Sequence, residues 1–462
     1  MLIDVAKHAE KIIQELRKWD KVNIITHIDA DGIAAGAIAK RAMEREGIES
    51  SIHFVKYLDR EVIEEAKGMD GLIWFTDLGS GSISKLHEMN YIITDHHMPD
   101  IEGKIHTWRH FNPHLYGRDG GREISGAGLV YLIASKMNEG NKDMVDLAIV
   151  GASGDLQDSF SCRLEGWNQA IVREGIMENK IEVKKDIRLF GRQTKPIHKI
   201  LQYADDPILP GLTGREGACL SFLNSLGIDI KKGKNWKRWI DLDSWEKKKI
   251  ISALIKLLLS KGFGHSYASR LIGEVYELEN EEEGAELRDT KEYATLLNST
   301  ARYGHADVGL QICMGKRGET IKKAKKLLRN HRKNLVEGLK LVKEEGIQEH
   351  GFIQYFHAGE NIRDTIIGIV TGMLLHSKHV RDGTPLIGFA EKENGDVKAS
   401  ARAPSLLQQK GIDLSKAMQK AASRLGGTGG GHETAAGATI PKGKEEDFLY
   451  MLEQEIKNQL TL

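Results

Sequence analysis

Cysteine and long hydrophobic runs are both scarce in this sequence. The three cysteines, Cys162, Cys219 and Cys313, lie far apart and form no CxxC pair, which argues against a disulfide framework and a structural zinc site. No apolar run is long enough to span a membrane, and the charged, amphipathic first 21 residues do not resemble a signal peptide. We therefore expect a protein of the reducing cytoplasm without a membrane partner.

A net charge is also lacking, because Lys+Arg and Asp+Glu both number 66. A neutral total does not exclude a nucleic-acid partner, since phosphate binding depends on local basic patches. Aromatic residues make up only 6% and charged residues 29% of the chain, a composition that leans toward a thermophilic source. At 462 residues the chain exceeds one ordinary core, and we expect two or three domains.

The alternation of strand and helix patterns over residues 1–178 predicts an α/β fold with a mainly parallel sheet. We predict strands near 22–26, 52–56, 72–76 and 91–94, and helices at 4–19, 33–46 and 125–139. The predicted domains are 1–204, a helical insertion at 205–315, a long basic connecting helix at 316–348 and a smaller α/β domain at 349–462. Most charge runs in the insertion are typical of solvated faces, but KKGKNWKRW (231–239) suits a nucleic-acid strand.

Four apolar runs, all interpreted as buried strands, end at residues that bind metals. The residues in question are His27, Asp29, Asp31, Asp77, Asp95, His96, His97 and Asp155. In an open parallel sheet, ligands collect beyond the carboxyl ends of the strands. Several carboxylates in one partly buried place repel each other, and divalent cations relieve that repulsion. The pattern therefore predicts a two-metal hydrolase.

Each motif also has a simpler interpretation. Asp29 can be a helix N-cap and Asp77 a turn residue. Three candidate ligands within five residues, and the strand-end position that Asp77 shares with them, favour metal binding instead. Asp155 can also be interpreted as a helix N-cap, and the nearby Asp158 is an alternative candidate for the same metal ligand. Of the adjacent His96 and His97, one can bind metal while the other faces substrate, and a neighbouring Asp95 can fix an imidazole tautomer.

A second candidate site lies near the C-terminal end of the sequence. The segment GGTGGGHETAAG lacks the GxGxxG spacing and the GK[ST] ending of nucleotide-binding loops. Its glycines, including Gly430 and Gly431, can instead form a nest of backbone N–H groups that binds an anion, with His432 as a further donor. The alternative is a flexible linker. Arg402 in KASARAP is a second candidate phosphate ligand.

Taken together, these motifs resemble a known family. HIDADG, FTDLGSG, TDHH and GASGD are similar to the four motifs of the DHH phosphoesterases, and SARAP followed by GGTGGGH resembles their DHH-associated C-terminal domain. FNPH (111–114), ISGAGLVY (124–131) and the overall size resemble the RecJ branch, in particular archaeal RecJ-like nucleases. For residues 205–315 we find no matching motif.

The resemblance implies an exonuclease that depends on two divalent ions, preferably Mn²⁺ with Mg²⁺ as an alternative, and degrades single-stranded DNA or RNA to mononucleotides in replication or repair. It implies that His27 and Asp29 bind one ion, that Asp31, His96 and Asp155 bind the other, and that Asp77 bridges the two. It also implies a catalytic His97 at the scissile phosphate, with Asp95 behind the ligands. The end of the substrate would be bound by Arg402, Gly430, Gly431 and His432. Implied protein partners are the Hef helicase/nuclease or the GINS complex. The alternatives are a phosphodiesterase of short oligonucleotides or cyclic dinucleotides, and a scaffold protein of the replisome.

Overall fold

A computed structural model of the chain describes residues 2–86, 89–100, 108–375, 377, 380–381 and 383–460. The chain divides into two compact units, residues 1–325 and 326–462, and the helix α13 (Glu319–Glu345) contains the division between them. Among the described helices, none combines the length and the apolar character that crossing a membrane requires.

The first unit is built on a five-stranded parallel sheet with the order β2-β1-β3-β4-β5. The strands are β1 (Lys21–His27), β2 (Glu49–Val55), β3 (Leu72–Thr76), β4 (Tyr91–Thr94) and β5 (His110–Phe111). The three central strands are nearly continuous apolar runs because both of their faces are covered. This confirms the α/β fold with a mainly parallel sheet that the sequence predicts.

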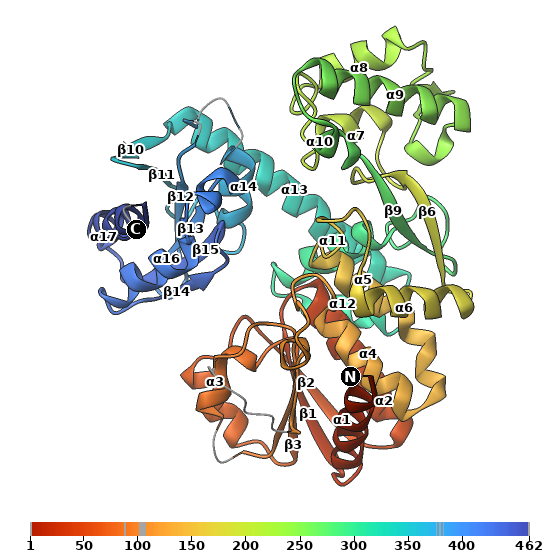
Figure 1. Cartoon of the computed structure of the whole chain (residues 1–462), viewed down its shortest axis with the longest axis vertical. Coiled ribbons are helices and arrows are strands. Elements are labelled where there is room, and N and C mark those ends of the chain that lie inside the picture. Colours follow the sequence, from red (N-terminus) through yellow and green to blue (C-terminus); the bar gives the residue numbers. More distant parts are fainter. Residues whose placement is uncertain are drawn as a thin grey trace. The chain divides into compact units, whose positions relative to one another are not determined.

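Helices cover both faces of this sheet (Figure 1). On one face α2 (Ala30–Glu46) and α4 (Gly126–Met137) contact the strands, with α1 (Leu2–Leu16) and α5 (Val145–Gly154) packed behind them. On the other face α3 (Arg60–Lys67) packs Ile63 and Ala66 against Ile73 and Phe75. The short turns between these elements bring the carboxyl ends of the strands next to the first turns of α2 and α4.

The structure corrects one prediction. The apolar run 147–152 is not a strand but part of α5, and Asp155 therefore follows a helix. Residues 147–153 of this helix are all buried, so the run shows no helical periodicity, and a short apolar run of this kind cannot be distinguished from a buried strand by pattern alone. The additional parallel strand is instead the two-residue β5, and Asn112 follows it directly.

A helical module lies between the two strands of an antiparallel ribbon, β6 (Ile181–Ile187) and β9 (Ile272–Leu278). It contains α7 (Ile197–Gln202), α8 (Glu216–Ser225), the short strands β7 (Lys231–Lys232) and β8 (Asn235–Trp236), α9 (Ser244–Ser260) and α10 (His265–Ser269). The module has its own core, which includes Cys219, Trp239 and Leu254. The helices after the ribbon, α11 (Thr290–Ala301) and α12 (Ala306–Cys313), pack instead against α2 and α5, and α6 (Gly166–Met177) precedes the ribbon.

The second unit contains a six-stranded sheet with the order β10-β11-β12-β13-β15-β14. Its elements are β10 (Gln348–His350), β11 (Ile353–His357), α14 (Ile367–Leu375), β12 (Leu386–Glu391), β13 (Val397–Arg402), α15 (Ser405–Gln409), α16 (Leu414–Ser423), β14 (Thr428–Gly431), β15 (Ala435–Ile440) and α17 (Glu445–Leu460). Leu386 packs in the cluster with α14 and the end of α13, whereas its neighbour Ile387 packs in the cluster with α16 and α17. This alternation places the sheet between two helical layers.

Candidate metal centre

The side chains predicted as metal ligands come together at the carboxyl end of the five-stranded sheet. Two groups have ligand atoms that all lie within 4.8 Å of one another, namely His27, Asp29 and Asp77, and Asp31, His96 and Asp155. A third such group, which joins Asp77 and His96 to Asp95 and His97, lies beside them. The arrangement has the same division into two ligand sets that the resemblance implies.

The first group surrounds the tight connection between β1 and α2. His27 Nδ1 lies 2.8 Å from Asp29 Oδ2. The other oxygen of Asp29 accepts a hydrogen bond from Gly32 N at 2.9 Å and caps α2. A side chain at position 32 would place its Cβ only 2.1 Å from the carbonyl oxygen of His27, so only glycine permits this connection. Asp29 is therefore an N-cap with one oxygen and faces His27 with the other.

The second group joins β4 to α2 and α5. His96 Nε2 lies 3.2 Å from Asp155 Oδ2 and 3.8 Å from Asp31 Oδ2. His96 Nδ1 is 2.7 Å from the carbonyl oxygen of Gly120, to which only a protonated Nδ1 can donate, so the lone pair of a neutral imidazole is on Nε2. Asp31 accepts hydrogen bonds from the backbone N–H groups of Gly126 and Ala127, at 2.6 and 3.0 Å, at the start of α4.

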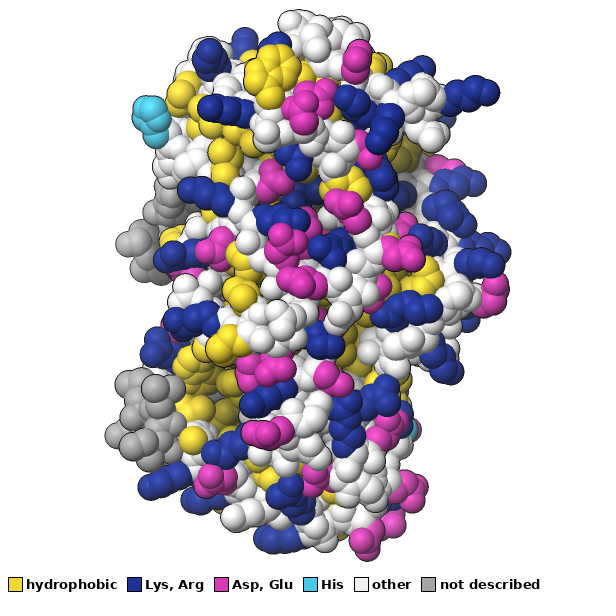
Figure 2. Space-filling model, turned by 90° about the vertical axis from the view of Figure 1, so that its right-hand side faces the viewer, with side chains coloured by type: hydrophobic (Ala, Val, Ile, Leu, Met, Phe, Trp, Pro, Cys, Tyr) yellow, Lys and Arg dark blue, Asp and Glu magenta, His cyan; other side chains and the backbone are white. Residues whose placement is uncertain are grey.

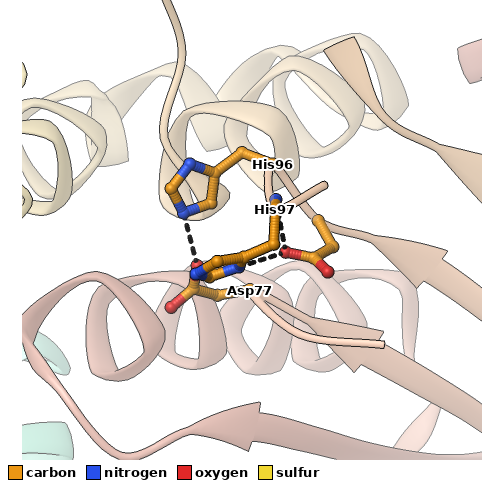
Figure 3. Close-up of side chains that lie close together, drawn as sticks. Asp77, His96 and His97 are labelled. Carbon is orange, nitrogen blue, oxygen red and sulfur yellow. Dashed lines mark hydrogen bonds and ion pairs between the residues drawn. The ribbon is translucent and has the colours of Figure 1, made fainter. Parts of the chain in front are cut away.

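Asp77 lies between the two groups. Its Oδ1 is 3.2 Å from His96 Nε2 and its Oδ2 is 3.6 Å from His27 Nδ1, and Figure 3 shows His96 directed at this carboxylate. The Asp77 side chain is 1% exposed, and its backbone φ of 58° lies in the left-handed region, which glycine, asparagine and aspartate adopt more readily than other residues. The placement is that of a carboxylate shared between two sites.

Four buried polar atoms of this cluster have no hydrogen-bond partner within the described part of the chain. They are His27 Nδ1, His96 Nε2 and both carboxylate oxygens of Asp77. Buried polar atoms are otherwise almost always hydrogen-bonded. Oxygen and imidazole nitrogen are the donors that hard and borderline divalent ions prefer. The donor set and its unpaired atoms therefore fit a pair of divalent cations.

The carboxylates of the cluster perturb each other's protonation. Burial, together with the charges of Asp77 and Asp155, raises the pKa of Asp31 well above its ordinary value. Burial also raises the pKa of Asp155, to about 7, against the opposing charge of His96. Burial lowers the pKa of His96, but the neighbouring Asp77 carboxylate and the charge of Asp155 outweigh it and raise that pKa well above normal. In the absence of cations the cluster therefore retains protons at neutral pH.

His97 differs from the other histidines because its side chain is half-exposed. Asp95 holds the ring, with Oδ1 2.8 Å from His97 Nδ1, and this carboxylate in turn accepts from the backbone N–H of Ser80 at 2.8 Å. Burial lowers the pKa of His97, but the charge of Asp95 and its hydrogen bond to the ring outweigh that effect and raise it. The Asn112 amide donates to the carbonyl of His97 and to Ser80 Oγ, both at 2.8 Å. His97 is thus a positioned imidazole at the open side of the cluster.

Asp155 and Asp158, which the sequence alone could confuse, have different environments. Asp158 is buried and its Oδ2 lies 3.1 Å from Arg188 Nη2 and 2.6 Å from Lys291 Nζ. These two cations hold the pKa of Asp158 below its usual value despite burial. Asp158 therefore joins the ribbon and α11 to the sheet domain, and Asp155 is the carboxylate that faces His96.

The sequence reasoning missed residues that α11 contributes. The amide oxygen of Asn298 accepts from the backbone N–H of Ala30 at 3.0 Å, within the loop that carries Asp29 and Asp31. Burial lowers the pKa of the Arg302 guanidinium, partly offset by the charge of Asp29. Neither residue follows a strand, so no local pattern indicated them. Asn112 was detectable, because it follows a strand end in the same way as the ligands do.

The predicted substrate-binding residues lie together at one end of the second sheet. Arg402 ends β13 and is paired with Ala435, whereas Gly431 ends the edge strand β14 and is paired with Ala436. No carboxylate among the described residues pairs with Arg402, whose guanidinium donates to the Ala401 carbonyl, and burial lowers its pKa. Gly430 and Gly431 form part of a strand, not a turn nest, and His432 begins the tight connection to β15. The linker interpretation is wrong, and any anion binding would use the edge of β14.

Family models divide the chain into three matched parts. The DHH family N-terminal domain matches residues 21–152, the DHH-CID domain residues 189–272 and the DHHA1 domain residues 349–458. An uncharacterized protein of Methanocaldococcus jannaschii, MJ0831, is 32% identical over 473 residues, which cover 99% of this chain and 100% of that protein. This chain belongs to the DHH family. The DHH-CID match also identifies most of the predicted insertion, for which the sequence reasoning found no motif.

Solved structures with the same fold include RecJ and CDC45. RecJ of Thermus thermophilus in complex with Mn²⁺ has a TM-score of 0.58 at 17% identity, over 98% of this chain and 55% of that one. The same RecJ in complex with Mg²⁺ has a TM-score of 0.53, over 98% of this chain and 52% of that one, also at 17% identity. CDC45 of Entamoeba histolytica has a TM-score of 0.69 at 14% identity, over 98% and 99% of the two chains. This DHH protein thus has the RecJ-like phosphoesterase fold and spans about half the length of the Thermus RecJ.

Proposed function

We propose that this DHH protein is a two-metal-ion exonuclease that removes mononucleotides from single-stranded DNA, or from single-stranded RNA. The observation that carries the proposal is the pair of adjacent ligand groups with Asp77 between them, and the four buried ligand atoms that have no hydrogen-bond partner in the described part of the chain. RecJ structures of this fold contain Mn²⁺ or Mg²⁺, which are the ions we expect here, with Mn²⁺ preferred because histidines take part.

In this proposal His27 and Asp29 would hold one ion, Asp31, His96 and Asp155 would hold the other, and Asp77 would be the shared ligand. Such a pair of ions would supply Lewis-acid activation of a phosphoryl oxygen and a nucleophile formed from water at neutral pH. The hydrogen bonds of Asp31 to the start of α4 and of His96 to Gly120 fix the directions of these ligand atoms before any ion binds.

His97 is proposed to contact the scissile phosphate. Because Asp95 holds Nδ1 and raises the pKa of the ring, the protonated imidazole is favoured, and its Nε2–H group can donate to a phosphoryl oxygen whose charge grows in the transition state. Arg302 adds positive charge beside Asp29. In the second unit, Arg402 is proposed to bind a phosphate or the terminal nucleotide, because its guanidinium has no carboxylate partner in the described part of that unit.

A purely scaffolding role is disfavoured by the complete ligand set. An array of buried carboxylates that repel one another has a cost in stability, and a scaffold has no use for it. The alternative for an enzyme is a phosphodiesterase of short oligonucleotides or cyclic dinucleotides, and the dependence of hydrolysis on substrate length distinguishes it.

The decisive experiment uses end-labelled single-stranded DNA and RNA, each blocked at one end, incubated with the protein and Mn²⁺. We expect release of mononucleotides from one end of the single strand and no release from a blunt duplex. Two oligonucleotides of about 3 and about 30 nucleotides test chain-length dependence. If the folded, Mn²⁺-loaded protein releases nothing from any of these substrates, the exonuclease proposal is wrong.

A further inference from the structure

The module within 189–272 carries a strong local charge in a chain that is neutral overall. It contains 15 Lys and Arg residues but only 7 Asp and Glu residues, whereas the whole chain contains 66 of each. In Figure 1, α8 and α9 form the upper end of the first unit, and dark blue side chains predominate over magenta ones at the same end of Figure 2. This imbalance points to a polyanionic ligand.

Exposed aromatic rings accompany this charge. The large hydrophobic side chains exposed in 189–272, a segment described throughout, are Tyr203, Trp236 and Trp245, with exposures of 50%, 40% and 61%. No aliphatic side chain is among them. An apolar protein-docking face would expose leucine, isoleucine or methionine as well, so three separate rings are better suited to stacking with bases.

Each of these rings is paired with a lysine. The ammonium groups of Lys199, Lys231 and Lys249 lie 5.8, 4.9 and 4.4 Å from the ring centroids of Tyr203, Trp236 and Trp245, respectively. A lysine beside an exposed ring allows one nucleotide to stack its base and place its phosphate against the ammonium group. The same combination repeats on α7, the β7–β8 hairpin and α9.

Direct contacts connect these three elements. The Trp236 ring lies 4.5 Å from the ring of His198 on α7. On the other side, Lys237 Nζ is 2.8 Å from Glu246 Oε1, next to Trp245 at the start of α9. The hairpin also exposes Lys232 and Lys234 beside Lys231. The rings and lysines are therefore carried by elements that contact one another, and the β6–β9 ribbon separates the exposed surface of these elements from the metal cluster (Figure 1).

We propose that this surface is a second binding site for a single nucleic-acid strand. The site would retain a long substrate while the end of that substrate is hydrolysed at the metal cluster. The inference rests on the proposed function in taking a single strand as the ligand. The binding site itself contains none of the metal ligands, so its strand affinity can be measured without catalysis.

The test measures binding of a labelled single strand of about 30 nucleotides in EDTA, by fluorescence anisotropy at several salt concentrations. The variant Lys231→Gln/Lys232→Gln/Lys234→Gln removes three charges. We expect its Kd to rise about tenfold and the slope of log K against log salt to fall by about 2, since each single-strand phosphate contact contributes about 0.7. The control Lys7→Gln/Lys11→Gln/Lys18→Gln removes the same charge from exposed lysines on α1 and in the turn that follows it, and should leave both values unchanged.

A second variant tests stacking. Trp245→Ala removes an exposed ring and should weaken binding about 5-fold to 100-fold, whereas Trp245→Phe should retain most of the affinity. The inference is overturned if the triple-lysine variant and Trp245→Ala both bind the strand with the wild-type affinity and salt slope. An acidic protein would then be the next ligand to test. The proposed function fails separately, if the wild-type protein binds the strand but never hydrolyses it. Hydrolysis of a substrate of about 3 nucleotides should be unaffected by either variant.

Discussion

Replacing Asp77 by asparagine removes one charge from the centre of the cluster while leaving its shape intact. Asparagine fills nearly the same volume and adopts the left-handed backbone conformation readily, so the φ of 58° at this position does not oppose the substitution. What the variant loses is a second anionic oxygen, because the amide nitrogen cannot bind a cation. Asp77→Asn therefore separates metal binding from folding more cleanly than an alanine substitution would.

The magnitude follows from linkage between metal binding and folding. An ion present at 100 times its Kd stabilises the folded protein by about 2.7 kcal/mol. In a unit of about 325 residues, 1 kcal/mol shifts Tm by about 1–2 °C, so Mn²⁺ should raise the wild-type Tm by roughly 3–5 °C. If losing the shared ligand weakens binding about 100-fold, the same Mn²⁺ concentration stabilises the variant by only about 0.4 kcal/mol, a shift of about 0.5 °C.

The assay is thermal unfolding, followed by circular dichroism, of both proteins in EDTA and across a Mn²⁺ titration. The matched control is Asp143→Asn, which removes an exposed carboxylate whose partner is Arg45 at 2.7 Å and should keep the wild-type Mn²⁺ shift. An Asp77→Asn protein with the full wild-type shift would refute the assignment of Asp77 as the shared ligand. A wild-type protein that millimolar Mn²⁺ does not stabilise would refute the metal centre as a whole.

Three other substitutions test separate parts of the structure. Gly126→Ala places a Cβ 2.5 Å from the Asp77 side chain, so Mn²⁺ affinity measured by calorimetry should fall about 10- to 100-fold; unchanged affinity would contradict the close packing described. Burial raises the pKa of Asp146 to about 6, so the folded state binds this proton more tightly than the unfolded state and loses stability as pH rises past that value. Asp146→Asn should therefore be more stable than wild type by about 1–2 kcal/mol in urea unfolding near pH 8, with no gain near pH 4; an equal effect at both pH values would contradict this. Arg402→Leu should leave Tm unchanged or raise it, because the variant loses a buried cation that has no carboxylate partner. The value of kcat/KM on a single strand should fall about 100-fold, and unaltered kinetics would remove Arg402 from the substrate site.

Much of the sheet was predictable because its strands are short apolar runs that end in polar residues. The predicted strands at 72–76 and 91–94 coincide with β3 and β4. The run 147–152 has the same composition but belongs to a helix buried on every side. Its burial comes from packing against α2, α4 and α11, and these contacts are not encoded in the local pattern. The sequence therefore indicated Asp155 as a candidate ligand, although the strand predicted before it is a helix.

The limits of the sequence reasoning about the site have the same origin. The ligands His27, Asp29 and Asp31 lie within five residues, and a local pattern is enough to find them. Asn298 and Arg302 reach the same loop from α11, after the whole helical module has intervened in the chain. Only the tertiary packing of α11 on α2 and α5 brings them there. Gly430 and Gly431 were expected in a nest of backbone N–H groups, but pairing with β15 extends them into an edge strand.

The helix ends around the cluster explain why its carboxylates are not equivalent. Asp29 caps the start of α2 and Asp31 accepts two N–H groups at the start of α4, so the positive ends of two helices stabilise both anions. Asp155 instead follows the last turn of α5 and lies at the negative end of that helix. Burial already raises the pKa of Asp155 to about 7, and the helix dipole adds to the cost of ionising it. Asp31 keeps a pKa well above its ordinary value despite its two backbone donors, because it is buried beside the charges of Asp77 and Asp155. A cation relieves the burial and repulsion of both carboxylates, so we expect the ionisation of Asp31 and of Asp155 to depend on an ion in the second group.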